Sequence, residues 1–124
     1  MLNCLAVGIG GFMGSVARYL MGFVPLKPSE GFPVNTLLIN VIGAFIIGLV
    51  ISFSTRNEGI NPQLVLLLKV GFCGGFTTFS TFSFETAKLI ENGAYGMVLL
   101  YVLLSVCLGI SMIMLSQWLV QNVF

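Results

Sequence analysis

The chain has 124 residues, of which 57% are hydrophobic and only 7% are charged, and its formal net charge is +1. Because about a quarter of the residues in a globular domain are charged, this chain has too little charge to cover a soluble surface. The lack of a basic run also excludes nucleic acid as a partner, since phosphate binding needs clustered Lys and Arg. The composition predicts a single domain that lies in a membrane.

Few residues are available for catalysis or for binding a metal through side chains. The chain has no His, which removes the commonest metal ligand and the commonest general base. Cys4, Cys73 and Cys107 lie far apart in apolar stretches and are predicted to be free thiols. Without a paired carboxylate site or a nucleophile beside a base, the sequence does not indicate an enzyme.

Four stretches are long enough to cross a bilayer as helices, which takes about 20 apolar residues. The predicted spans are residues 2–23, 34–54, 63–91 and 95–120, with turn residues and charges between them. No Lys or Arg precedes the first apolar run, so it is predicted to be a retained helix and not a signal peptide. Four crossings place both termini on one side of the membrane.

The first two predicted spans carry residues with more than one interpretation. Gly10 and Gly14 have the spacing of a helix-packing motif. Arg18 either extends to the membrane interface or holds an ion pair or a helix end. Asn40, on the same face of the second span as Thr36, either forms hydrogen bonds between helices or donates to a permeating anion.

The third predicted span is unusual, because residues 71–83 combine three glycines with five hydroxyl residues at mid-membrane depth. A non-helical break is tolerated there only where it is buried in protein or lines a polar cavity. Gly74 and Gly75 are the predicted position of such a break, with close helix packing as the alternative. A broken helix leaves carbonyls at one half-helix end and N–H groups at the other, and both are ion sites.

Aromatic and hydroxyl side chains follow the predicted break. Phe79 and Phe82 are three residues apart, so they share a helix face, and Ser80 lies beside them. Phe at this spacing ordinarily contacts lipid or the core, but the positive edge of an aromatic ring also attracts a small anion. On the fourth span, Tyr101 and Ser105 form a second line of hydroxyls, for interhelical hydrogen bonds or for the same anion.

The basic residues divide almost evenly between the two sides of the membrane. Arg56 and Lys69 fall toward the side of the termini, and Arg18, Lys27 and Lys88 toward the other. A chain without a charge bias has no signal for one orientation. We therefore expect dual topology and an antiparallel homodimer, with a single orientation set by other cues as the alternative.

Residues 71–83, Gly-Phe-Cys-Gly-Gly-Phe-Thr-Thr-Phe-Ser-Thr-Phe-Ser, resemble the third-helix signature of the CrcB/Fluc fluoride channels. Asn40 and the spacing of Gly11, Gly14 and Arg18 also resemble that family, and the resemblance covers the whole chain. It implies an all-α membrane protein, an antiparallel dual-topology homodimer of four-helix subunits with a broken third helix. It further implies passive export of toxic fluoride through two pores in the inner (plasma) membrane.

The resemblance also implies roles for single residues. Phe79 and Phe82 correspond to pore phenylalanines whose ring edges meet fluoride, and Asn40 to a pore asparagine. Ser80, Thr36, Tyr101 and Ser105 correspond to polar pore positions, Gly74 and Thr77 to carbonyl ligands of a structural Na⁺ between the subunits, and Arg18 to a structural arginine. No lysine is expected in the pore, because a fixed cation would hold fluoride too tightly.

Two other functions are compatible with a small membrane protein. A proton-coupled multidrug exporter needs a carboxylate inside the membrane, and Glu85 is the only candidate. However, Glu85 and Lys88 are predicted to form a solvated vestibule or a surface pair at the outer end of the third span. A purely structural subunit would leave the hydroxyl-rich third span unexplained.

Overall fold

The computed structural model describes residues 1–26 and 31–124, whose regular elements are all helices. Lys27, which was counted in the charge balance, lies outside the described residues. The elements are α1 (Leu2–Met21), α2 (Val34–Arg56), α3 (Pro62–Leu66), η1 (Leu67–Phe72), α4 (Cys73–Phe76), α5 (Phe79–Glu91) and α6 (Tyr95–Asn122). The four spans that these elements form begin and end within two residues of the predicted spans.

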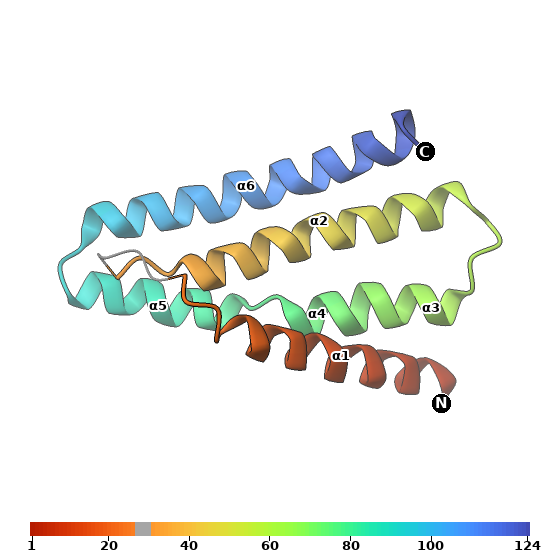
Figure 1. Ribbon diagram of the computed structural model, residues 1–124, viewed down its shortest axis with the longest axis horizontal. Coiled ribbons are helices and arrows are strands. Elements are labelled where there is room, and N and C mark those ends of the chain that lie inside the picture. Colours follow the sequence, from red (N-terminus) through yellow and green to blue (C-terminus); the bar gives the residue numbers. More distant parts are fainter. Residues whose placement is uncertain (27–30) are drawn as a thin grey trace.

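Four helices in the described chain are long and apolar enough to cross a membrane when α3, η1, α4 and α5 are taken as one bent span, Pro62–Glu91. This confirms the predicted class of an all-α, four-helix membrane protein with a broken third helix. Both termini lie at the same end of the bundle (Figure 1), as four crossings require.

The helices pack as two neighbouring pairs. Along most of its length α2 lies beside α6, while α1 runs beside α3, η1 and α4 (Figure 1). The remaining segment, α5, lies on the other side of the break and contacts α6 and α2. Asn35 joins α1 to α2, because its amide Nδ2 donates to the carbonyl oxygens of Met21 and Val24.

Glycines bring the backbones of α1 and the third span into direct contact. A Cβ added to Gly71 would lie 2.7 Å from the Val7 carbonyl oxygen and 2.8 Å from the Gly10 Cα. One added to Gly75 would lie 2.5 Å from the Gly11 carbonyl oxygen. Small residues allow such close approach between membrane helices, and dispersion between the backbones then stabilises the pair. The packing interpretation of Gly10 and Gly14 is correct, and it also holds for Gly75.

The break in the third span lies at Thr77 and Thr78, so its predicted position at Gly74 and Gly75 is wrong. Thr77 has φ −74° and ψ 159°, and Thr78 has φ −150° and ψ 115°. Both are extended conformations that β-branched residues adopt readily, so the break does not require glycine. Gly74 and Gly75 remain within the last helical turn before it, α4.

A π-helical segment, η1, precedes α4 and was not predicted. It covers Leu67–Phe72 and includes Lys69 and Gly71. A π-helix is wider than an α-helix and is common at functional sites. Here it lies at the level where the third span contacts the glycine face of α1.

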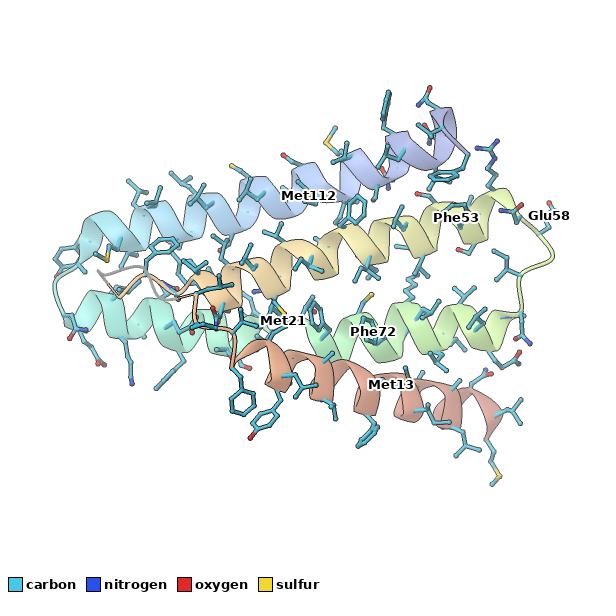
Figure 2. The ribbon with its side chains drawn as sticks, in the orientation of Figure 1. Met13, Met21, Phe53, Glu58, Phe72 and Met112 are labelled. Carbon is cyan, nitrogen blue, oxygen red and sulfur yellow. The ribbon has the colours of Figure 1, made fainter. Side chains whose placement is uncertain are left out.

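Large apolar side chains cover the outside of the bundle (Figure 2). Phe12 on α1 is 72% exposed, and Leu99 and Met114 on α6 are also exposed. Such a surface is stable against lipid or a second subunit, but not against water. Cys4, Cys73 and Cys107 are all free thiols, as predicted.

Gly14→Ala should separate α1 from the third span. The new Cβ would lie 2.8 Å from the Phe76 backbone nitrogen, and overpacking of this kind costs about 1–3 kcal/mol. Gly8→Ala is the matched control on the same helix, because a Cβ there meets nothing within 4 Å. Thermal unfolding in detergent should show a lower Tm for Gly14→Ala alone, and equal Tm values would contradict the packing.

Candidate functional site

The side chain of Asn40 holds the break in the third span. The Thr78 backbone N–H donates to Asn40 Oδ1 at 2.8 Å, and Asn40 Nδ2 donates to the Thr78 carbonyl oxygen at 3.1 Å. Asn40 thus satisfies the Thr78 N–H, which the break frees, and adds a hydrogen bond to the carbonyl of this N-cap residue of α5. The interhelical interpretation of Asn40 is correct, and one of its two amide protons remains for another acceptor.

The two half-helix ends at the break have further partners. Arg18 donates from its guanidinium to the Thr77 carbonyl oxygen at 3.3 Å, so the arginine holds a helix end, as one of its two interpretations proposed. The Thr81 backbone N–H donates to Thr78 Oγ1 at 3.1 Å, which caps the start of α5.

The Gly74 carbonyl loses its ordinary helical partner at this break. In an unbroken helix the Thr78 N–H would donate to it, but that N–H donates to Asn40. The carbonyl lies at the C-terminal end of α4, where the helix dipole is negative. Space beside Gly74 is open, since an added Cβ would meet nothing within 4 Å. The Gly74 carbonyl is therefore a neutral oxygen without its helical partner.

A groove of about 570 Å³ runs along the broken third span between α2 and α6. Four of the seven predicted pore residues line it, namely Asn40, Phe79, Phe82 and Ser105, and so do the predicted sodium ligands Gly74 and Thr77. The rings of Phe79 and Phe82 have centroids 5.9 Å apart, and Phe82 lies 5.0 Å from the Tyr101 ring. Backbone of the break also lines the groove, through Thr77 and Thr78.

The predicted serine hydroxyls near this groove differ in whether they already have a hydrogen-bond partner. Ser105 Oγ is buried and has no hydrogen-bond partner among the described residues. Ser80 does not line the groove, and its hydroxyl lies 3.4 Å from Thr78 Oγ1. Of the predicted hydroxyls, that of Ser105 is therefore the best placed to form a new hydrogen bond.

Glu85 accepts hydrogen bonds from the hydroxyls of two other predicted site residues. Thr36 Oγ1 donates to Glu85 Oε1 at 2.9 Å, and Tyr101 Oη donates to Glu85 Oε2 at 2.8 Å. Tyr101 is fully buried, and Thr36 is 5% exposed. In this conformation both protons are committed to the carboxylate, so neither hydroxyl is available to an anion. Glu85 and Lys88 line one cavity at the outer end of the span, which agrees with the vestibule alternative, while the carboxylate accepts from Thr36 and Tyr101.

Lys69 also lines the groove, which contradicts the expectation that no lysine lies there. It projects from η1 toward the same groove as Cys73 and Gly74. The sequence interpretation placed it only by membrane side and did not assign it to the groove wall. The wide turn of η1, which the sequence pattern did not indicate, lies at this residue.

Sequence reasoning missed Glu85 and the Thr78 backbone as parts of the site. An ionisable residue inside a predicted span is a functional candidate by default, and this signal identifies Glu85 when its position near the span end is not discounted. No side-chain pattern could have identified the Thr78 backbone, because its role depends on where the helix breaks.

Comparison with known proteins identifies a family. Residues 5–117 match the family described as CrcB-like protein, Camphor Resistance (CrcB). A Yersinia pestis protein named fluoride-specific ion channel FluC 1 is 47% identical over 118 residues, which are 95% of this chain and 93% of that protein. A Gloeothece citriformis protein named fluoride-specific ion channel FluC is 44% identical over 98% of this chain and 99% of its own length. The FluC of Geobacter sulfurreducens is 49% identical over 87% of this chain and 88% of its own length.

Asn40→Leu should release the Thr78 backbone from α2. The substitution removes both hydrogen bonds to Thr78, and interhelical bonds of this kind contribute about 0.6 kcal/mol on average and up to about 1.7 kcal/mol. Hydrogen exchange followed by mass spectrometry should show faster exchange in residues 77–81. Ser83→Ala is the control, because Ser83 bonds only within α5. Unchanged protection in Asn40→Leu would contradict the role of Asn40.

Proposed function

We propose, since this chain belongs to the CrcB-like protein family, that it is a fluoride-selective ion channel through which toxic fluoride leaves the cell passively. The chain is a multi-pass protein of the inner membrane, with four spanning helices. It is not an enzyme. Family membership also removes the exporter and the purely structural subunit as alternatives.

The observation that supports this function most strongly is the composition of the groove. Phe79 and Phe82 present two rings, and Asn40 and Ser105 add an amide proton and a hydroxyl without a partner. Ring edges, hydroxyls and amides are all weak electropositive donors. Together they replace water around a small anion without a charged side chain beside the rings.

Selectivity in this mechanism comes from the kind and number of donors. Fluoride is small and strongly hydrated, so it enters only where several donors substitute for its water. Because each donor is weak, the ion also leaves, which conduction requires.

We extend the proposal to an antiparallel homodimer with two pores. Phe79 is 80% exposed although it lies in the middle of a membrane span. A second subunit would cover this ring and close the open side of the groove. The near balance of Arg18 and Lys88 against Arg56 and Lys69 supports insertion in both orientations.

We also propose that the Gly74 and Thr77 carbonyls bind a structural Na⁺ between the subunits. The Gly74 carbonyl, which lacks the Thr78 N–H as its helical partner, and the negative end of α4 support the site. The Thr77 carbonyl accepts one hydrogen bond from Arg18 and keeps a second lone pair for the cation. Bound sodium would supply positive charge that joins two helix ends at the symmetry axis, while Asn40 and Arg18 orient the carbonyls.

Purified protein in liposomes loaded with potassium fluoride should release fluoride after valinomycin is added, and matched liposomes should retain chloride. Phe82→Ile should slow fluoride release by tenfold or more, because the branched aliphatic chain has no positive ring edge. Phe84→Ile is the matched control, since Phe84 lies on α5 beneath Lys88 and outside the groove. A fluoride electrode measures the rate. Equal fluoride and chloride release would disprove the function, and an unaffected Phe82→Ile would disprove the role of the ring.

Removal of sodium should weaken the assembly. Replacing Na⁺ with N-methylglucamine should lower the Tm and shift the protein from dimer to monomer, because a ligand that binds only the assembled state stabilises it by mass action. Light scattering after size exclusion measures the mass, and the shift should reverse when Na⁺ is added. A mass and Tm independent of Na⁺ would contradict the sodium site, and a monomer under all conditions would contradict the dimer.

A further inference from the structure

We infer that Lys69 is an electrostatic attractor that raises the fluoride concentration at one end of the conduction groove. This inference rests on the proposed channel function. Lys69 lines the groove with Cys73 and Gly74, and Phe79 and Phe82 line the same groove farther along. Lys69 is therefore the one cation on the wall of this groove among the residues that the structure describes.

The charge of Lys69 is not balanced within the groove. The described carboxylates Glu58, Glu85 and Glu91 are all absent from its lining. Glu85 accepts hydrogen bonds from Thr36 and Tyr101 at the other end of the third span. Glu58 lies in the turn between α2 and α3 (Figure 2). The field of the ammonium group consequently acts on whatever anion enters the groove.

The distance between Lys69 and the rings reconciles attraction with conduction. Phe79 is ten residues farther along the span, which is about 15 Å at the helical rise of about 1.5 Å per residue and somewhat more because Thr77 and Thr78 are extended. Screening by salt at physiological ionic strength has a length of about 8 Å, so the ammonium acts near its own end of the groove. Fluoride is gathered there and is not bound at the rings, where a fixed cation would trap it.

The position of Lys69 on η1 suits the attraction of an anion into the groove. Lys69 is exposed, and its neighbours on the groove wall include the apolar Ile47, Val70 and Ile113. A lysine stem packs along such apolar surface while the ammonium stays with water or an anion. The π-helical turn places Lys69 on the same side as Cys73, four residues on, where it faces the groove.

The test compares Lys69→Met with Lys69→Arg in fluoride efflux from liposomes at fluoride concentrations below saturation. Lys69→Met should reduce the initial rate about three- to tenfold at about 0.01 M ionic strength, where the screening length is about 30 Å, and by less than twofold at about 1 M, where it is about 3 Å. Lys69→Arg should keep the wild-type rate, and Lys69→Glu should be slower than Lys69→Met. The impermeant salt N-methylglucamine sulfate sets the ionic strength.

A rate for Lys69→Met that equals wild type at low ionic strength would overturn the inference, and so would a loss that persists unchanged in high salt. Size exclusion and Tm confirm that each variant is folded. If the wild-type protein itself releases no fluoride, the proposed function fails. If it releases fluoride and Lys69 variants behave like wild type, only the role of Lys69 fails.

Discussion

The structure depends on the two hydrogen bonds between Asn40 and the backbone of Thr78. A chain cannot leave the helical conformation inside a bilayer unless its freed N–H and C=O groups find partners in the protein. Asn40 on α2 accepts from the freed Thr78 N–H and donates to the Thr78 carbonyl, and Arg18 on α1 donates to the Thr77 carbonyl. Two neighbouring helices thus hold the break from opposite sides.

This arrangement places the groove and determines which donors face it. The extended residues Thr77 and Thr78 redirect the chain, so α5 starts at Phe79 and carries both rings against the space between α2 and α6. The same path brings Glu85 to Thr36 and Tyr101, which commits two hydroxyls to a carboxylate. The donors that remain for an anion are the ring edges, Ser105 and one proton of Asn40.

The sequence was sufficient to predict four spans and several residues that line the groove, because hydropathy identifies membrane helices and polar residues at membrane depth are rare. It was not sufficient to locate the break. Glycine at 74 and 75 was compatible with both packing and an unusual backbone, and contacts with α1 decide for packing at Gly75. Nor could it show that Glu85 bonds Thr36 and Tyr101 or that Lys69 faces the groove, because these depend on how helices rotate about their axes.

The most direct test of this account is the fluoride efflux rate of Arg18→Met in liposomes, beside Arg18→Lys. Arg18 holds the Thr77 carbonyl but does not line the groove, so any effect on fluoride must pass through the break. We expect Arg18→Met with the wild-type oligomeric state to lose most of its fluoride flux and Arg18→Lys to retain more. A wild-type rate from folded Arg18→Met would contradict the dependence of conduction on a break held by its neighbours.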